Sequence, residues 1–311
     1  MQKYKILKDV LDFAKNKFYK HDIENPSLDM AILAAKALGL SKIQLITKEY
    51  VSFDTLSISD DKIQKFLYFI ELRCKKNSIS EILGIKNFYG LDFIVTNDVL
   101  TPRPETEILV EKVFNYILKN NINNIIDIGT GSGCIAITVA MLLKKKRLEN
   151  LKNIKILACD ISEKALEVAK KNAKKNGVLD MIEFQKSNLL ENINKKYLEN
   201  ACIVTNLPYI PESDAKKMSE EVLNGDPKLA LFSGKTGTDL YEKLFTDLFQ
   251  ENSNFYNINS CFFEFDSGMN TENIQKKYYE NLLLNKLEIG NNDISFFEDY
   301  SGCERFGKIL V

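Results

Sequence analysis

Ile126-Asp127-Ile128-Gly129-Thr130-Gly131-Ser132-Gly133 is the stretch that decides the fold. It ends a short apolar run, 124–128, that predicts a buried strand, and it leads into an apolar run, 133–144, that predicts a helix. Gly129 and Gly131 let the backbone approach a ligand where a Cβ would clash, and the amides at the helix start carry partial positive charge. Such a strand-to-helix loop predicts a ligand site in an open α/β sheet.

Strands and helices alternate after this loop. The remaining expected elements are strands at 154–159, 181–185, 201–205 and 259–265, helices at 162–176 and 237–250, and a closing antiparallel pair at 293–297 and 304–311. Strands alternating with helices require right-handed crossovers and a mainly parallel sheet that is covered on both faces. We therefore predict an α/β, Rossmann-like domain with a mainly parallel seven-stranded sheet.

The chain ahead of this domain has a different pattern. Over residues 1–86 the apolar residues recur at helical spacing, which predicts a small helical domain. The pattern leaves open whether its helices serve packing alone or substrate recognition. Residues 87–104 form an alternating run with a turn in its middle, followed by two prolines, which predicts a β-hairpin and a stiff linker. Residues 105–311 then form the α/β domain, which carries the predicted ligand site.

The composition excludes several classes of protein. The chain has 311 residues, of which 45% are hydrophobic and 27% charged, as in globular proteins. Lys and Arg number 42 against 43 Asp and Glu, and this net charge of −1 argues against direct binding of bare nucleic acid. His21 is the only histidine and the six cysteines form no C-x-x-C pair, so we predict no metal site and no disulfide.

No targeting or membrane segment is evident in the sequence. Residues 1–5 do not begin a signal peptide. The longest apolar stretch, 135–143, is nine residues long, whereas a membrane helix needs ~20. We expect a cytoplasmic monomer without membrane contact.

Three ligands compete for the glycine-rich loop. A phosphate-binding P-loop needs a lysine after its last glycine, and none follows Gly133. A dinucleotide fingerprint needs glycine or alanine where Cys134 stands. S-adenosyl-L-methionine needs a carboxylate at the end of the second strand for its ribose hydroxyls, and Asp160 occupies that place, although it would also suit a helix cap. The pattern favours S-adenosyl-L-methionine while leaving the other two open.

The tetrapeptide Asn206-Leu207-Pro208-Tyr209 follows the strand at 201–205. A planar amide or exocyclic amine is a poor nucleophile because its lone pair is delocalised. Two oxygen acceptors for its N–H groups, here Asn206 Oδ1 and the Leu207 carbonyl, would orient that nitrogen. Pro208 restricts the backbone of Leu207, and Tyr209 offers a ring for stacking. The tetrapeptide therefore predicts methyl transfer to a planar nitrogen.

At this point the sequence resembles the HemK-type N5-glutamine methyltransferases along nearly its whole length. The resembling segments are Asn25-Pro26-Ser27-Leu28-Asp29, Ile82-Leu83-Gly84, Thr101-Pro102-Arg103-Pro104-Glu105-Thr106-Glu107, Asp226-Pro227 and Asp299-Tyr300-Ser301-Gly302. The Pro-Arg-Pro-Glu-Thr-Glu signature is the most specific of them.

The resemblance implies a class I methyltransferase catalytic domain at residues 105–311 behind a helical substrate-recognition domain at residues 1–86. It implies that the substrate is the glutamine side-chain amide in the Gly-Gly-Gln motif of class 1 peptide chain release factors. By matching position it assigns S-adenosyl-L-methionine to Asp127, Gly129, Thr130, Gly131, Ser132, Gly133, Asp160, Leu189 and Asn206, and it assigns catalysis and glutamine binding to Asn206, Leu207, Pro208 and Tyr209.

Some features keep other functions open. The family usually has proline at position 207, and Asn-Leu-Pro-Tyr is typical of the ribosomal RNA adenine dimethyltransferases, so an N6-adenine RNA or DNA methyltransferase is the main alternative. That activity needs a basic surface for a flipped base, and the one uninterrupted run of four basic residues, Lys144-Lys145-Lys146-Arg147, is typical of a solvated helix end. A ribosomal-protein glutamine methyltransferase and a non-catalytic scaffold remain further alternatives. Glu105 and Glu107 either order the linker or face the cofactor.

Overall fold

The computed structural model describes residues 4–146, 154–251, 257–266 and 274–311. It divides into two compact units, one of Met1–Ile85 with Ser219–Gly225 and one of Lys86–Met218 with Asp226–Val311. The sequence analysis placed 219–225 within the catalytic range, whereas the structure groups this segment with the helical unit. Arg73 explains the grouping, because its guanidinium binds Glu221 at 2.7 Å and Asp29 at 2.7 Å.

The first unit consists of short helices around an apolar core. Its helices are α1 (Leu7–Lys20), α2 (Pro26–Leu38), α3 (Lys42–Thr47), α4 (Asp60–Cys74), α5 (Ile79–Leu83) and α9 (Glu220–Gly225). Gly39 ends α2 at φ +74°, a left-handed conformation that favours glycine. Ser41 begins α3 and accepts the amide of Gln44, which satisfies a donor at the helix start. Local capping thus separates helices that a single apolar core then packs together.

The second unit contains the sheet. Its strands are β1 (Ile85–Phe88) and β2 (Leu91–Ile94) in a hairpin, and β3 (Asn124–Ile128), β4 (Lys155–Asp160), β5 (Ile182–Lys186), β6 (Ala201–Thr205), β7 (Ile258–Glu264), β8 (Ile294–Glu298) and β9 (Glu304–Leu310) in the large sheet. Among the described residues this sheet has seven strands in the order β5-β4-β3-β6-β7-β9-β8. The pairs from β5 to β7 are parallel, and β9 is antiparallel to both β7 and β8. The predicted Rossmann-like fold is confirmed.

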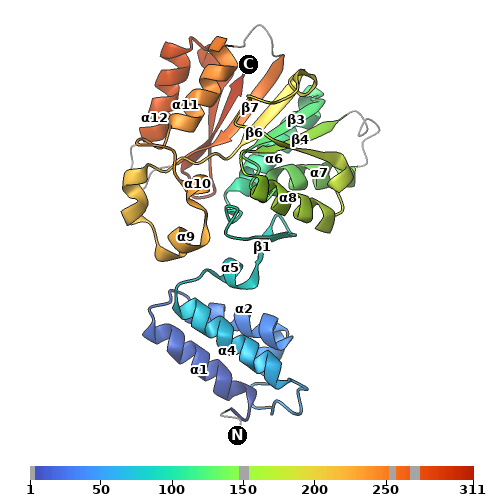
Figure 1. Ribbon diagram of the computed structural model, residues 1–311, viewed down its shortest axis with the longest axis vertical. Coiled ribbons are helices and arrows are strands. Elements are labelled where there is room, and N and C mark those ends of the chain that lie inside the picture. Colours follow the sequence, from blue (N-terminus) through green and yellow to red (C-terminus); the bar gives the residue numbers. More distant parts are fainter. Residues whose placement is uncertain (1–3, 147–153, 252–256, 267–273) are drawn as a thin grey trace. The chain divides into compact units, whose positions relative to one another are not determined.

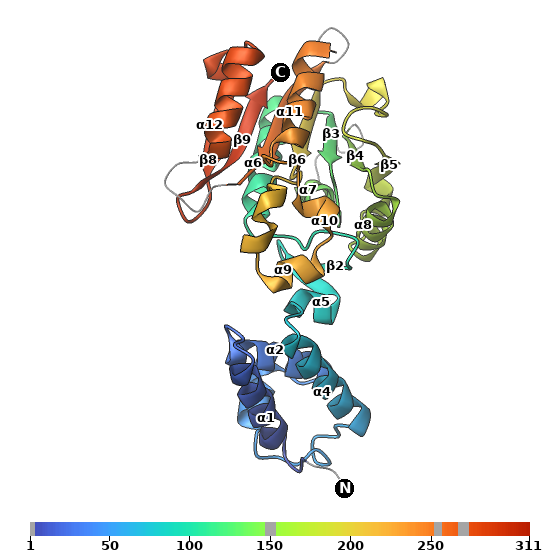
Figure 2. The same cartoon turned by 60° about the vertical axis from the view of Figure 1, so that its left-hand side comes forward.

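Helices cover both faces of the large sheet. They are α6 (Thr106–Asn120), α7 (Cys134–Lys146), α8 (Glu163–Lys175), α11 (Asp239–Thr246) and α12 (Ile274–Asn281), while the short α10 (Lys228–Leu231) lies in the segment between β6 and α11. Successive strand residues point to opposite faces, so Ile125 packs in the cluster with α6, α7 and α8, while Ile126 packs in the cluster with α11 and α12. Figures 1 and 2 show these two groups of helices on opposite sides of the sheet.

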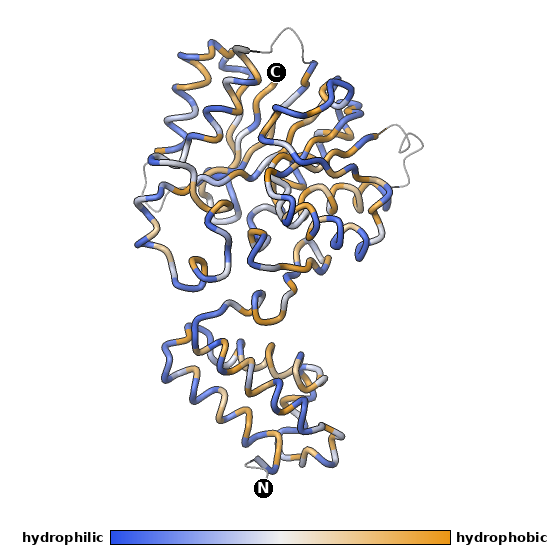
Figure 3. Tube along the Cα trace, viewed as in Figure 1, coloured by the Kyte–Doolittle hydropathy of each residue, from blue (hydrophilic) through white to orange (hydrophobic). Residues whose placement is uncertain are grey.

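The central strands are apolar on both faces, as parallel strands under helices must be. Every residue of β3 and β6 is buried. In Figure 3 the inner strands are mostly hydrophobic, whereas the outer helices alternate between hydrophobic and hydrophilic residues. This alternation explains why periodicity located the elements so closely.

Small differences from the expected elements have local causes. The helix expected at 237–250 begins at Asp239 and changes to π-helical geometry over Asp247–Glu251. The basic cluster does end a helix, since Lys144, Lys145 and Lys146 form the last turn of α7, while Arg147 lies outside the described residues. Within the described part of the chain, no helix is both long and apolar enough to cross a membrane.

Candidate active site

The strand order brings two loops together. The chain runs outward from β3 to β4 and β5, then returns to β6 on the other side of β3, so the order reverses between β3 and β6. Ile128 and Thr205, the last residues of these strands, pair in register, and Thr205 Oγ1 donates to the Ile128 carbonyl at 2.7 Å. In open α/β sheets, ligands bind beyond the carboxyl ends of the strands at such a reversal.

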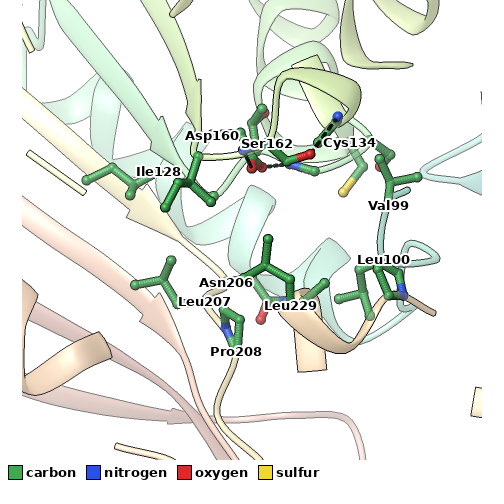
Figure 4. Close-up of a pocket in the computed structure, with 18 of the residues that line it drawn as sticks. Val99, Leu100, Ile128, Cys134, Asp160, Ser162, Asn206, Leu207, Pro208 and Leu229 are labelled. Carbon is green, nitrogen blue, oxygen red and sulfur yellow. Dashed lines mark hydrogen bonds between the residues drawn. The ribbon is translucent and has the colours of Figure 1, made fainter. Parts of the chain in front are cut away.

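A pocket opens at this point. Figure 4 shows Asn206, Leu207 and Pro208 facing Asp160 and Ser162 across it. Of the residues expected from the sequence to form the site, the pocket is lined by Gly129, Thr130, Gly131, Ser132, Asp160, Leu189, Asn206, Leu207 and Pro208. The fold therefore unites the glycine-rich loop, the end of β4 and most of the tetrapeptide.

Asp160 ends β4 and organises the floor of this pocket. Its Oδ2 accepts the Gly131 amide at 2.9 Å, and its Oδ1 accepts the Ser162 amide at 2.9 Å. Burial raises the pKa of this carboxyl, while the backbone amides lower it. Each carboxylate oxygen offers about two acceptor sites, so one on each remains for a ligand hydroxyl.

Asp127 lies beneath the loop and is not among the residues that line the pocket. It is fully buried, and its Oδ2 accepts the Thr130 hydroxyl at 2.7 Å and the Ala136 amide at 3.1 Å. Its Oδ1 has no hydrogen-bond partner among the described residues. Burial raises the pKa of Asp127 from 3.8 to about 7. Asp127 was expected among the cofactor-binding residues, and the structure places it beneath the loop, which it holds through Thr130 and Ala136.

Two other expected residues also lie off the pocket lining. A Cβ on Gly133, at φ +82°, would lie 2.7 Å from Ile137 Cδ1 and 3.2 Å from Ala169 Cβ, so this glycine permits α7 and α8 to pack. The Tyr209 ring packs against the core beneath α11 and α12, and the Tyr209 carbonyl accepts Gln275 Nε2 at 2.6 Å. The chain turns away after Pro208, so the expected stacking ring does not border the pocket.

Leu189 has a backbone conformation that is unusual for a bulky residue. It lies at φ +49°, it is buried, and it lines the pocket. Ser187 Oγ donates to its carbonyl at 2.9 Å and holds this turn in place. Asn188 also lines the pocket and donates from Nδ2 to Glu191 at 2.8 Å.

A third wall of the pocket consists of residues that the sequence analysis did not assign to the site. It is formed by Val99, Leu100, Pro102, Arg103 and Thr106 together with Pro227, Leu229 and Ala230. Asp226 joins the two segments, because its Oδ1 accepts the Thr101 amide at 2.9 Å and its Oδ2 accepts Arg103 at 2.8 Å. The Pro-Arg-Pro-Glu-Thr-Glu signature was the signal that could have identified half of this wall.

Within that signature, the acidic residues are outside the pocket lining. Glu107 instead accepts the Tyr89 amide at 2.7 Å, which holds the hairpin turn against α6. Thr106 lines the pocket between them and accepts a hydrogen bond from Asn206 Nδ2 at 3.2 Å. Asn206 Oδ1 has no hydrogen-bond partner in the described parts of the chain. An acceptor at a strand tip is thus available opposite the glycine-rich loop.

Comparison with known proteins identifies the family. The Methyltransferase small domain family matches residues 104–233. A release factor glutamine methyltransferase of Dictyoglomus turgidum is 32% identical over 306 residues, covering 98% of this chain and 98% of that protein. The chain belongs to the release factor glutamine methyltransferase family. Another relative of that name, from Clostridium acetobutylicum, is 33% identical and covers 78% of this chain and 76% of its own length.

A further relative supports the enzyme class, and a solved structure supports the fold of this release factor glutamine methyltransferase family member. The bifunctional methyltransferase of Rickettsia typhi is 34% identical over 76% of this chain and 46% of its own length. The hMettl16 catalytic domain shares the fold, with a TM-score of 0.51 and 15% identity over 81% of this chain and 82% of that one. The chain is therefore a methyltransferase that uses S-adenosyl-L-methionine.

The pocket fits that methyl donor. Gly129 and Gly131, at φ +71° and +55°, present backbone without side chains along one wall. Asp160 keeps acceptor capacity for a ribose diol, and Leu189 supplies apolar surface nearby. The alternatives drawn from the loop alone, a P-loop and a dinucleotide site, are not favoured.

Proposed function

We propose that this chain methylates the side-chain amide nitrogen of the glutamine in the Gly-Gly-Gln motif of class 1 peptide chain release factors. The observation that carries the proposal is that Asn206 and Leu207 line the same pocket as Gly129 and Asp160. An amide-orienting group thereby faces the place where the methyl donor fits. The relatives named as release factor glutamine methyltransferases support the choice of substrate.

The glycine-rich loop and the end of β4 hold the cofactor in this proposal. Asp160 accepts the ribose hydroxyls, the backbone at Gly129 and Gly131 passes beside the aminoacyl end, and Leu189 packs against the adenine. When bound, S-adenosyl-L-methionine supplies an electrophilic methyl group on its sulfonium. The largely apolar walls of the pocket exclude water from that group.

The tetrapeptide orients the nitrogen that is to be methylated. Asn206 Oδ1 and the Leu207 carbonyl accept its two N–H groups, which localises electron density on nitrogen and stabilises developing positive charge. Pro208 and Leu229, which line the pocket, supply apolar contact in place of the expected Tyr209 ring. The nitrogen–methyl bond forms as the methyl–sulfur bond breaks, which leaves a neutral thioether, and the methylated nitrogen then loses one proton to solvent. No general base precedes this step, in keeping with a single histidine, His21, outside the pocket lining.

The helical unit is proposed to recognise the release factor. It exposes three large apolar side chains in and after α3, with Ile43 72%, Ile46 75% and Tyr50 68% exposed. Such side chains gathered on a monomer are typical of a protein-binding surface. We further propose that the chain acts as a cytoplasmic monomer without direct contact to nucleic acid or membrane, which its net charge of −1 supports.

The test uses purified chain, purified class 1 release factor and labelled S-adenosyl-L-methionine. We expect label on the Gly-Gly-Gln glutamine by mass spectrometry, and about 100-fold to 1,000-fold slower labelling by Asn206→Ala, the loss typical of removing one such polar group. Asn120→Ala is the matched control, because Asn120 sits exposed at the end of α6 and bonds only locally to Tyr116. Label on an RNA adenine but not on the release factor would overturn the proposal.

A further inference from the structure

A buried hydrogen-bond chain connects Asn206 to the end of β7. Asn206 Nδ2 donates to Thr106 Oγ1 at 3.2 Å, and Thr106 Oγ1 donates to Glu264 Oε2 at 2.7 Å. Thr106 and Glu264 are each 1% exposed. Thr106 begins α6 and Glu264 ends β7, so three elements that are distant in the sequence meet behind the tetrapeptide.

This chain of bonds fixes which way the Asn206 amide points. A threonine hydroxyl has one hydrogen, and an ionised carboxylate can only accept. When Thr106 gives its hydrogen to Glu264, it can only accept from Asn206, so Nδ2 faces Thr106. Oδ1 is then left as the atom offered to the pocket, which is the acceptor that amide methylation needs.

A second chain of hydrogen bonds runs from Glu264 to the backbone of the tetrapeptide. The Tyr241 hydroxyl donates to the Glu264 carbonyl and accepts the Leu207 amide at 3.0 Å. Tyr241 is fully buried in α11, so this hydroxyl has a fixed position. The bond at the Leu207 amide holds the residue whose carbonyl is the other proposed acceptor. The side chain and the main chain of Glu264 thus each support one acceptor.

We propose that Glu264 is a positioning residue for glutamine methylation, which acts through Thr106 on the Asn206 amide and through Tyr241 on the Leu207 backbone. This inference rests on the function proposed above, and it names the residues that hold the two proposed acceptors, Asn206 Oδ1 and the Leu207 carbonyl, in place. Neither Glu264 nor Tyr241 borders the pocket, so both act through other groups, whereas Thr106 also lines it.

The ionisation of Glu264 gives the inference a measurable signature. The charged and polar groups that act on this carboxyl are Thr106, Arg305, Arg103, Glu105, Tyr209, Tyr241 and Cys134. Burial, the largest influence, raises the pKa of Glu264 from 4.5 to about 7. A protonated Glu264 can donate a hydrogen bond to the Thr106 hydroxyl. The Thr106 hydroxyl can then donate its own hydrogen to Asn206, which favours Asn206 Oδ1 facing Thr106 instead of the pocket. Methylation should therefore decrease below about pH 7.

The experiment compares Thr106→Val, Thr106→Ser and Glu264→Gln in the full chain, with release factor as substrate. Thr106→Val removes the hydroxyl at nearly constant volume, and we expect kcat to decrease about 10-fold to 100-fold, the usual cost of losing a supporting partner. The dissociation constant for S-adenosyl-L-methionine should stay within about twofold, because Thr106→Val leaves the glycine-rich loop and Asp160 unchanged. Thr106→Ser should restore most of kcat.

Thr138→Val is the matched control, because Thr138 is equally buried but its hydroxyl bonds only to the Cys134 carbonyl within α7. It should leave kcat unchanged. If Thr106→Val lowers the melting temperature, the pH profile of Glu264→Gln decides instead, since an amide in place of the carboxyl should abolish the decrease in kcat below about pH 7.

The outcomes separate this inference from the proposed function. Two results would overturn the positioning role alone. One is a fully active Thr106→Val beside an inactive Asn206→Ala. The other is a Glu264→Gln variant whose kcat still decreases below about pH 7 as in the wild type. A fully active Asn206→Ala would overturn the proposed function itself. Loss of kcat in Thr106→Val with rescue by Thr106→Ser supports the inference.

Discussion

Gly129 and Leu207 come from different strand ends, yet a Cβ on Gly129 would lie 2.9 Å from Leu207 Cδ2. The reversal of strand order between β3 and β6 forces this approach. Gly129 also has φ +71°, so two independent constraints require glycine at the position where the two loops of the pocket meet.

Gly129→Ala should therefore lower methylation activity more than an alanine at positive φ would by itself. Gly90→Ala is the matched control, because Gly90 has φ +73° and nothing within 4 Å of an added Cβ. Both variants should lose roughly 1–2 kcal/mol of unfolding free energy from the positive φ. Only Gly129→Ala should also lower kcat/KM, by about tenfold or more, because Leu207 must shift. Equal kcat/KM for the two variants would contradict this expectation.

Asp160→Asn should weaken binding of S-adenosyl-L-methionine. Hydrogen bonds to a charged acceptor contribute about 1.5–3 kcal/mol, so we expect the dissociation constant measured by calorimetry to rise roughly 10-fold to 150-fold. Glu163→Gln is the control: it lies three residues away, and its side chain, 72% exposed, pairs with Lys186. Its affinity should remain that of the wild type, and similar losses in both variants would argue against a direct role for Asp160.

Asp127 should make stability depend on pH. Because its pKa is raised from 3.8 to about 7, the folded state holds more protons than the unfolded state between these values. Its contribution to the free energy of unfolding therefore decreases as pH rises from about 4 to about 7, and levels off above. Urea unfolding of wild type and Asp127→Asn at several pH values measures this, and a stability difference that does not vary with pH in that window would refute it.

The ion pairs of Arg73 should hold Ser219–Gly225 in the helical unit. The Arg73 side chain is 6% exposed and that of Asp29 10% exposed, so Arg73→Met leaves a buried carboxylate unpaired and should cost about 3–5 kcal/mol. Lys17→Met, which breaks a pair with the half-exposed Glu71, should cost about 1 kcal/mol or less. Denaturant unfolding of the full chain compares them. Limited proteolysis should cut at 219–225 earlier in Arg73→Met, and equal protection in both variants would count against this role.

The sequence by itself determined the class of fold and several of the residues that line the pocket. Period-two and period-3.6 patterns are local properties, so the strands at 124–128 and 201–205 were located to the residue. The glycine-rich loop, Asp160 and Asn206 could be found because parallel strands end at one edge of the sheet. The resemblance along the chain added the substrate.

The tertiary structure alone decided which of these residues border the pocket. Asp127 and Gly133 belong to the glycine-rich motif, but packing places one beneath the loop and uses the other to seat α7 on α8. Tyr209 turns toward the core because the chain bends after Pro208. The Asn206–Thr106 and Thr106–Glu264 bonds join residues that are 100 and 158 positions apart, and no local pattern encodes partners at such separations. Side-chain hydrogen bonds of this kind depend on how the strands and helices pack, which becomes defined only when the chain folds.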